Sequence, residues 1–246
     1  MNKFIAVLKL TIFIIWTLIA IVMQIVMRAV CTGDGIFYVP MLWHKVVCRI
    51  FGIRISVRGR AVRNQHVLYV SNHVSYLDIP VLASQVFGQF IAKKEVESWP
   101  LFGYLAKLQN TVFIDRSGAQ VDQDYQNVGD QLNSNKNLIL FPEGTSSDGS
   151  EIMPFRSRFF GLMLERQDNV LLQPITIALP DAQTQEERDL YAWYGEMELV
   201  PHLWVLAQNK GVDVRVTFHE PVHIGQEITR KELTNLCYEV IARGLK

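Results

Sequence analysis

The sequence predicts an α/β fold with a mostly parallel central sheet flanked by helices, preceded by an N-terminal membrane-associated helix or helical hairpin. Three observations predict this fold: a long apolar run near the N-terminus, an uneven distribution of charge, and strand–helix alternation beyond residue 50. Of the 246 residues, 49% are hydrophobic and 20% are charged, which excludes intrinsic disorder and allows a substantial core. We expect a membrane-associated helical segment at residues 1–50 and an α/β domain at residues 51–246.

The first element is an eighteen-residue apolar run, Leu10–Met27, whose polar members are Thr11, Thr17 and Gln24. As a helix it is ~27 Å long, close to the hydrocarbon thickness of a bilayer. A cleaved signal peptide is a weaker interpretation, because the run exceeds a typical h-region and Arg28 follows where a small residue is needed. A core helix is the other alternative. We predict membrane insertion, either by spanning or as a half-buried hairpin with a second amphipathic segment at about Phe37–Ile50.

Positive charge is concentrated in the first third of the chain. Residues 1–77 contain nine Lys and Arg but one acid, Asp34, and the remainder carries the balancing excess of acid because the net charge is zero. Such a split indicates a polyanionic partner, and the apolar run favours an anionic membrane surface over nucleic acid. The larger positive charge follows the apolar run, which places the body of the protein on the cytoplasmic face of the inner (plasma) membrane.

Beyond residue 50 the pattern alternates between strands and helices. Seven short β-rich runs occur, at Ile53–Val57, Val67–Val70, Phe90–Ala92, Val112–Ile114, Leu138–Phe141, Val170–Ile177 and Val214–Phe218. Helix-compatible stretches separate several of them, at Ile79–Val86, Leu101–Leu108, Gln123–Leu132 and Arg156–Leu164. This alternation predicts βαβ units and a mostly parallel sheet, in which chemistry gathers in the loops after the strands.

A histidine and an aspartate follow the second predicted strand, in the run Ser-Asn-His-Val-Ser-Tyr-Leu-Asp at residues 71–78. Pro80 suits a first helical turn, so His73 lies in the loop and can fold back toward Asp78. A carboxylate on one ring nitrogen fixes the tautomer and leaves the other nitrogen to accept a proton. The alternative is that Asp78 simply caps the helix.

Two further strand ends carry polar residues. The run Pro-Glu-Gly-Thr at residues 142–145 follows the fifth predicted strand, as a small loop able to present backbone N–H groups to an anion. Arg116 follows the fourth predicted strand, and a guanidinium is well suited to phosphate. Singly, each is an ordinary turn or surface ion pair; together with the His–Asp pair they predict a site.

These residues resemble the glycerolipid (lysophospholipid) acyltransferases, the 1-acylglycerol-3-phosphate acyltransferase group. Four blocks match in order: Asn-His-x4-Asp at 72–78, Phe-Ile-Asp-Arg at 113–116, Phe-Pro-Glu-Gly-Thr at 141–145 and Gln-Pro-Ile-Thr-Ile at 173–177. The resemblance covers about residues 50–180, with the blocks within about 67–180. The set in this order is specific, although no single block is.

The resemblance implies catalytic roles for two residues. His73 is the expected general base that deprotonates a glycerol hydroxyl, and Asp78 is expected to orient it. The hydroxyl then attacks an acyl thioester directly, without an acyl-enzyme. The implied acyl donor is acyl-CoA or acyl-carrier protein, with no other cofactor and no metal.

The resemblance also implies substrate-binding roles. Arg116 is expected to hold the acceptor's phosphate, helped by Lys93. Glu143 and Gly144 are expected to position the glycerol part of the acceptor, with Thr145 in the same turn.

The expected reaction is acylation of the free hydroxyl of 1-acyl-sn-glycerol 3-phosphate, giving phosphatidic acid in phospholipid biosynthesis. The wording Ser-Tyr-Leu-Asp and Thr-Ser-Ser-Asp-Gly resembles a bacterial subgroup that includes acyltransferases for lyso-ornithine lipid, so acylation of another lysolipid is the first alternative. A non-catalytic lipid-binding protein is the second.

The literal zinc-peptidase pattern His-Glu-x-x-His at residues 219–223 is rejected. That chemistry needs both histidines on one helical face, but Pro221 interrupts the would-be helix and Val214–Phe218 alternates like a strand. The C-terminal part also contains five aromatic or imidazole residues, Tyr191, Trp193, Tyr194, His202 and Trp204. We interpret them as a cover over an acyl groove or an interfacial surface, with ordinary core aromatics as the alternative.

Overall fold

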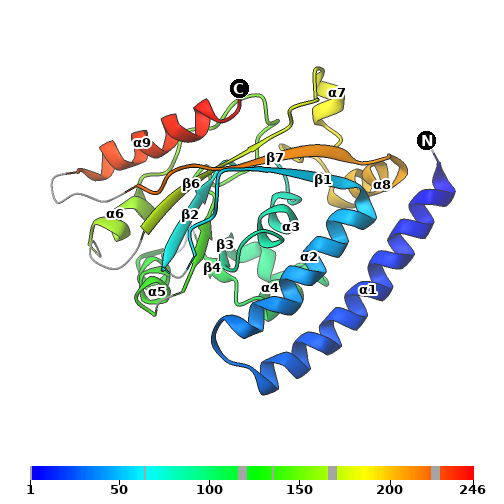
Figure 1. Ribbon diagram of the computed structural model, residues 1–246, viewed down its shortest axis with the longest axis horizontal. Helices are drawn as coiled ribbons and strands as arrows, with labels where there is room; N and C mark the ends of the chain where they lie inside the picture. Colours follow the sequence, from blue (N-terminus) through cyan, green and yellow to red (C-terminus); the bar gives the residue numbers. More distant parts are fainter. Residues whose placement is uncertain (1, 64, 116–120, 135, 166–170, 223–227) are drawn as a thin grey trace.

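The structure is a computed structural model that describes residues 2–63, 65–115, 121–134, 136–165, 171–222 and 228–246. Its strands form one seven-stranded sheet in the order β1-β7-β6-β2-β5-β3-β4 (Figure 1). The strands are β1 (Ile53–Arg58), β2 (Val67–Ser71), β3 (Gln89–Lys93), β4 (Val112–Ile114), β5 (Leu138–Leu140), β6 (Leu171–Ala178) and β7 (Val212–Phe218). The five strands β2 to β6 run parallel, whereas β1 and β7 pair in parallel with each other and join the sheet through the antiparallel β6–β7 pair.

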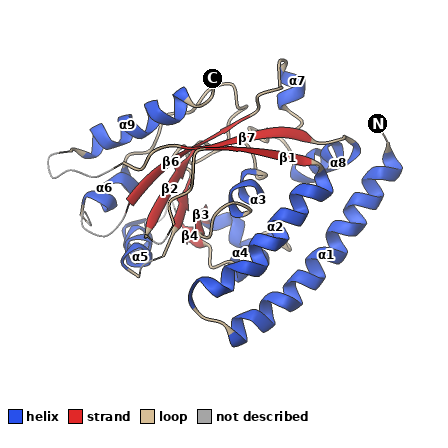
Figure 2. Ribbon diagram, in the orientation of Figure 1, coloured by secondary structure: helices blue, strands red, loops and turns tan. Residues whose placement is uncertain are grey.

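Helices cover both faces of this sheet (Figure 2). They are α1 (Lys3–Val30), α2 (Tyr38–Phe51), α3 (Asp78–Ala83), α4 (Phe102–Leu108), α5 (Val121–Asn133), α6 (Arg158–Leu164), α7 (Gln185–Arg188), α8 (Leu199–Gln208) and α9 (Arg230–Arg243), with short 3-10 turns η1 (Gly33–Phe37) and η2 (Lys94–Ser98). The predicted α/β class and mostly parallel sheet are confirmed, and each of the seven predicted strands is present.

The alternation of side chains along β2 divides the core in two. Val67 and Tyr69 pack in the cluster that includes residues of α2, α3 and α8, whereas Leu68 and Val70 pack with residues of α5, α6 and α9. Successive strand residues point to opposite faces, so a strand buried on both sides is apolar throughout. This explains why β2 reads as a continuous apolar run in the sequence.

The turn between α2 and β1 requires glycine. Gly52 ends α2 with φ of 74°, in the left-handed region, and a Cβ placed there would lie 2.4 Å from the carbonyl oxygen of Lys210. The close approach lets the Gly52 carbonyl accept a hydrogen bond from the Val212 N–H at 3.2 Å. The N-terminal hairpin is thereby joined to the sheet at the β1–β7 edge.

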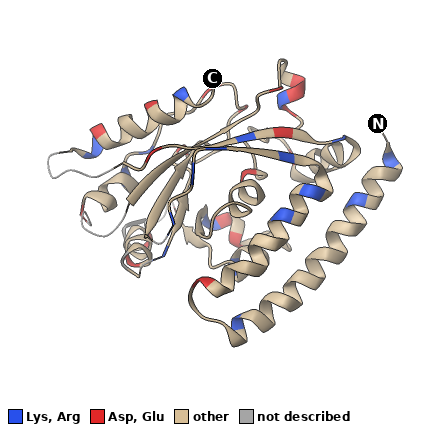
Figure 3. Ribbon diagram, viewed as in Figure 1, with Lys and Arg blue, Asp and Glu red and all other residues tan. Residues whose placement is uncertain are grey.

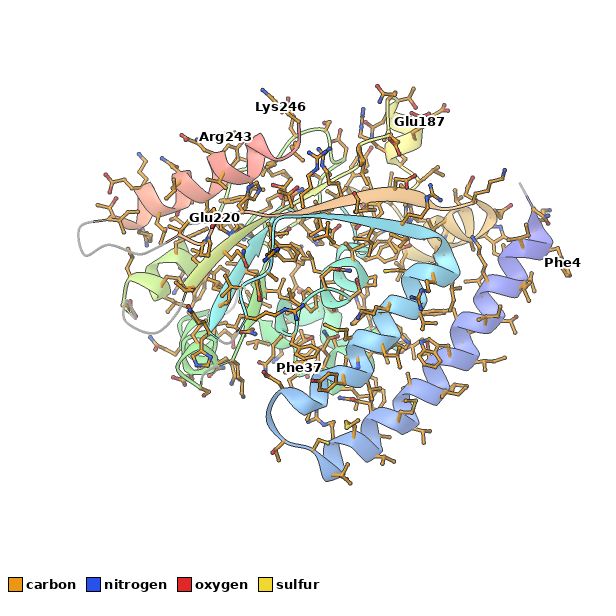
Figure 4. The ribbon with its side chains drawn as sticks, in the orientation of Figure 1. Phe4, Phe37, Glu187, Glu220, Arg243 and Lys246 are labelled. Atoms are coloured by element: carbon orange, nitrogen blue, oxygen red, sulfur yellow. The ribbon has the colours of Figure 1, made fainter. Side chains whose placement is uncertain are left out.

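Helix α1 is packed along one stripe and bare elsewhere. Its buried residues, spaced at helical intervals, are Ala6, Phe13, Thr17, Ala20 and Gln24. Most of the remaining residues are apolar and exposed, including Val22 at 63% and Phe4 at 76%, which Figure 4 labels. No Lys, Arg, Asp or Glu lies between Lys9 and Arg28, and Figure 3 shows this uncharged stretch along the outer edge of the molecule. Among the described residues, α1 is the one helix long and apolar enough to cross a membrane by length and composition.

The α/β domain holds both ends of this apolar stretch. Near one end, Lys9 Nζ donates to the carbonyl oxygen of Asn209 at 2.7 Å. Near the other, Arg28 donates to the carbonyl oxygen of Leu108 at 2.9 Å and to Asn110 Oδ1 at 2.8 Å. α2 returns antiparallel beside α1, so the predicted second amphipathic segment is present as the partner of a helical hairpin (Figure 1).

We expect Phe13→Ala to detach α1 from the body of the protein. The Phe13 ring is 6% exposed and contacts Trp43 and Phe51, with ring centroids 6.1 and 5.6 Å away. Loss of a buried Phe costs about 3–5 kcal/mol, so thermal unfolding in detergent should occur at a markedly lower temperature. Ile14→Ala is the matched control, because Ile14 is 54% exposed and should unfold like the wild type. Equal unfolding temperatures for the two variants would contradict this packing.

Candidate active site

Two neighbouring parallel strands bring their loops to the same edge of the sheet. β2 and β5 pair with Val70 opposite Leu140, and the chain then continues to His73 in one loop and Glu143 in the other. The His73 N–H donates to Glu143 Oε1 at 2.7 Å. Two motifs seventy residues apart in sequence therefore form one site, at the strand ends where parallel sheets place their chemistry.

The loop at residues 72–78, here called the His73 loop, folds back so that His73 Nδ1 lies 2.7 Å from Asp78 Oδ2. Asp78 opens α3 and its side chain is fully buried, whereas the His73 side chain keeps 21% exposure. With Nδ1–H donating to the carboxylate, Nε2 has a free lone pair and can accept a proton. The geometry is that of an oriented general base.

The Asp78 carboxylate accepts hydrogen bonds from four donors. Oδ2 accepts from the His73 ring and from the N–H groups of Val74 at 2.7 Å and Ser75 at 3.0 Å. Oδ1 accepts from the hydroxyl of Tyr191 at 2.7 Å. Hydrogen bonds to a carboxylate favour its charged form, which offsets the cost of burying it. The aspartate thus does more than cap α3.

Glu143 holds the backbone on both sides of the site. Its Oε1 accepts from His73 N–H, and its Oε2 accepts from Met153 N–H at 2.8 Å. The residue is 4% exposed, and burial raises the pKa of its carboxyl to about 7. The ring of Phe141, two residues earlier, stacks on the His73 ring with centroids 4.2 Å apart. Glu143 and Phe141 therefore fix the main chain and the ring of His73.

The other predicted substrate-binding residues lie around this pair. Gly144 is buried with φ of 77°, and Thr145 is exposed next to it. Lys93 ends β3, exposed, with its Cα paired to that of Ile114 at the end of β4. Lys93 thus lies at the same edge of the sheet as His73 and Glu143. Arg116 lies outside the described residues, so its predicted phosphate contact remains a prediction.

The first and fourth sequence blocks are joined by an amide side chain. Asn72 Nδ2 donates to the carbonyl oxygen of Ile177 at 2.9 Å, and Asn72 Oδ1 accepts from the Ile177 N–H at 2.8 Å. Asn72 is 2% exposed, so it satisfies buried backbone groups of β6 that would otherwise lack partners. The His73 loop is therefore fixed to β6 as well as to β5.

An apolar cavity of about 190 Å³ lies between the helical hairpin and the sheet. Its walls come from α1, α2, α3, α4, β3 and α8, and include Trp43, Leu77, Phe90, Leu105 and Leu203. Phe90 stacks on Phe141 at 6.2 Å, and Phe141 in turn stacks on His73. The cavity wall is thus connected to the His73–Asp78 pair through two stacked rings.

The aromatic residues after β6 pack on the His73 loop. The Trp193 N–H donates to the carbonyl oxygen of Val74 at 2.9 Å, and the Tyr76 hydroxyl lies 2.9 Å from His202 Nδ1. Tyr191 is fully buried, as expected for a core aromatic. The cover expected over an apolar groove is represented by α8, whose Leu203 lines the cavity. This segment, residues 189–204, is called the tail segment below.

The zinc-peptidase pattern does not form a helix over its described residues. β7 ends at Phe218, and His219 Nε2 lies 2.8 Å from the hydroxyl oxygen of Thr176; His223 is outside the described residues. The described part of the chain contains no group of three or more His, Cys, Asp or Glu able to hold a metal ion.

The fold and the His–Asp pair define the class of protein: an α/β acyltransferase. A family model described as Acyltransferase matches residues 54–178, half of the chain. The chain belongs to this family of glycerolipid acyltransferases, as the four sequence blocks predict. Tyr191 lies outside the matched residues.

Proteins similar to this chain are named for two different acyltransferase activities. The chain is 38% identical over 205 residues to a lyso-ornithine lipid O-acyltransferase of Brucella abortus, covering 79% of this chain and 76% of the relative. It is 31% identical over 153 residues to a 1-acyl-sn-glycerol-3-phosphate acyltransferase of Neisseria meningitidis, covering 62% of this chain and 58% of the relative. The crystal structure of the 1-acyl-sn-glycerophosphate acyltransferase of Thermotoga maritima has the same fold, with a TM-score of 0.77 over 99% of this chain and 94% of that one, at 20% identity.

Sequence reasoning missed Tyr191 as a partner of Asp78. The two residues are 113 positions apart, and no spacing rule links them. A buried carboxylate with one unassigned oxygen does predict a distant donor, but the sequence offers eight tyrosines from which to choose.

We expect the pH dependence of stability to reveal the buried Glu143. Because its pKa is raised from 4.5 to about 7, the folded protein retains a proton that the unfolded chain releases. Stability from this group is full below pH 4.5 and declines as the pH rises toward 7, by on the order of 3 kcal/mol. The difference in unfolding free energy between wild type and Glu143→Gln should therefore fall from pH 4.5 to pH 8, as measured by denaturant titration.

Glu151→Gln is the control for loss of one carboxylate, because Glu151 is exposed on the segment that follows Glu143. A wild-type advantage over Glu143→Gln that is constant or grows with pH would contradict the raised pKa.

Proposed function

We propose that this protein transfers a fatty acyl group from a thioester to the free hydroxyl of a lysolipid at a membrane surface. The single observation that carries the proposal is the His73–Asp78 pair, 2.7 Å apart, beside an apolar cavity. His73 Nε2 takes the proton as the acceptor hydroxyl attacks the thioester carbonyl, and returns it to the departing thiolate. A thioester is already activated, so general base catalysis and positioning are the contributions required.

The acyl chain is the proposed occupant of the apolar cavity. Burial of a hydrocarbon chain is favourable in proportion to the apolar area removed from water. The cavity wall includes Leu77, four residues beyond His73, and Phe90, which is stacked against Phe141. A chain held there would present its thioester near the imidazole, with acyl-CoA or acyl-carrier protein as the donor.

Lyso-ornithine lipid is the acceptor that we favour. The chain is 38% identical to the Brucella abortus enzyme of that name over most of both proteins, and the match to the Neisseria meningitidis enzyme covers less of either. The second candidate is 1-acyl-sn-glycerol 3-phosphate, giving phosphatidic acid. It is favoured by the exposed Lys93 at the end of β3 and by the phosphate contact predicted for Arg116. In this reading Glu143, Gly144 and Thr145 form the turn that positions the glycerol part.

We infer that α1 lies in one leaflet of the membrane rather than across it. Lys9 and Arg28 are nineteen residues apart, ~29 Å along a helix, yet both contact the α/β domain. If α1 spanned, the domain would have to follow it through the bilayer and expose polar backbone to lipid. With α1 in the interface, its bare apolar face enters the lipid of the cytoplasmic leaflet, and the neighbouring basic residues meet anionic headgroups.

The direct test is a product assay with purified protein. Given acyl-CoA or acyl-carrier protein and a panel containing lyso-ornithine lipid and 1-acylglycerol 3-phosphate, the wild type should release thiol and form an acylated product, identified by mass spectrometry. His73→Ala should reduce the rate at least ~10²-fold, because it removes the base. His66→Ala, a half-buried histidine outside the site, is the control and should keep activity. Absence of thioester consumption in the wild type would indicate a lipid-binding protein and reject the proposal.

The position of α1 can be tested by labelling its two ends. Cys31 directly follows α1, whereas Cys48 and Cys237 are buried. With the enzyme on the outer face of sealed vesicles, a membrane-impermeant maleimide should label Cys31 in the wild type and the new thiol in Lys3→Cys combined with Cys31→Ser. Labelling at one end alone would indicate that α1 spans the bilayer.

A further inference from the structure

We propose that Tyr191 is a positioning residue for the His73–Asp78 pair, supplied by the tail segment from beyond the region that matches the family model. Its hydroxyl donates to Asp78 Oδ1 at 2.7 Å. The inference rests on the proposed acyl transfer, because it concerns the base of that reaction. The role is to hold the carboxylate that holds the imidazole, so Tyr191 acts through Asp78 and does not touch the substrate.

The hydrogen-bond donors to the two oxygens of Asp78 come from different parts of the chain. Oδ2 takes its three donors from the His73 loop itself. Tyr191 is the one donor to Oδ1 among the described residues, and Asp78 has no exposure through which water could replace it. Rotation about Cβ–Cγ moves both oxygens together, so the bond from Tyr191 to Oδ1 adds a restraint, from a distant part of the chain, on the plane that the three donors to Oδ2 hold. The direction of the bond to His73 Nδ1 is set by that plane.

Tyr191 is itself firmly held. Its N–H donates to the carbonyl oxygen of Arg188 at 2.9 Å, at the end of α7, and its ring has no exposed surface. Two residues later the Trp193 N–H donates to the carbonyl oxygen of Val74, and the Ser146 hydroxyl donates to the Trp193 carbonyl oxygen. The tail segment is therefore bonded, through the backbone of Trp193, to the His73 loop and to the loop after β5.

The phenol also adjusts the charge that His73 experiences. Burial, reinforced by the nearby Asp78 charge, raises the pKa of Tyr191 far above its ordinary value, so the hydroxyl keeps its proton and remains a donor. Its hydrogen bond compensates part of the Asp78 charge. Without it, the bare carboxylate oxygen would stabilise protonated His73 more strongly, and a protonated imidazole cannot act as the base.

A purely structural role for Tyr191 makes a different prediction. If the residue only fills the core, Phe performs the same task, because it retains the ring and loses one oxygen. Tyr191→Phe is therefore the informative substitution. Tyr194→Phe is the matched control: its hydroxyl contacts Gln185 and Asp189 instead of Asp78, and Tyr194 is not among the described residues that line the cavity.

The experiment measures steady-state kinetics of both variants on the acceptor that the wild type uses. Tyr191→Phe should lower kcat about tenfold, because a less firmly held Asp78 leaves the imidazole less often in the reactive orientation, with the KM of donor and acceptor within about twofold of wild type. The acid limb of the pH profile of kcat/KM, on which Glu143 also titrates because burial raises its pKa to about 7, should move to higher pH by about half a unit relative to wild type. Tyr194→Phe should change neither. Wild-type kcat and an unmoved acid limb in Tyr191→Phe would overturn the proposal.

A second measurement does not require turnover. Carbethoxylation of His73 by diethyl pyrocarbonate, followed by peptide mass spectrometry, reports the fraction of neutral imidazole at each pH. Its midpoint should shift upward in Tyr191→Phe and stay in place in Tyr194→Phe. This shift would support the role of Tyr191 even if no acceptor were acylated, a result that would reject the proposed function alone; an unshifted midpoint would overturn the role of Tyr191.

Discussion

The site depends on one buried negative charge. Asp78 has no solvent exposure, and an isolated carboxylate in such a place would be protonated or would destabilise the fold. Four donors satisfy it: the His73 ring, two backbone N–H groups of the same loop and the Tyr191 hydroxyl. Since these donors bond both oxygens, from the His73 loop and from Tyr191, the carboxylate is held in one orientation, and His73 is fixed with it.

The sequence blocks of the family acquire physical roles around this charge. Glu143, from the third block, accepts the N–H of His73 and so connects the loops after β5 and β2. Asn72, from the first block, pairs with the backbone of Ile177 in the fourth. The first block is therefore hydrogen-bonded to both the third and the fourth. These bonds hold His73 in one orientation without any substrate, and in the proposed reaction such positioning would contribute to the rate.

The N-terminal hairpin lies between this network and the exposed apolar surface that we propose meets lipid. α1 buries one narrow stripe against the body and exposes the rest of its apolar surface, while α2, behind it, contributes Trp43 and Val47 to the wall of the cavity. The same hairpin thus has an exposed apolar surface on one side and an apolar cavity on the other. This arrangement suits a reaction in which both the acyl chain and the acceptor are lipidic.

Much of this architecture was predictable from local sequence. Period-two and apolar runs located all seven strands, the uncharged Leu10–Met27 run located α1, and strand-end positions selected His73, Asp78 and Glu143. These signals are local because the spacing of apolar residues within one helix or strand determines which of its faces is buried. Tertiary structure alone decided three other features. The β1–β7 pair runs antiparallel to β6, both ends of α1 pack on the α/β domain, and Tyr191 bonds to Asp78. These features join residues up to 200 positions apart, and which distant donor meets a buried acceptor follows from how the whole core packs.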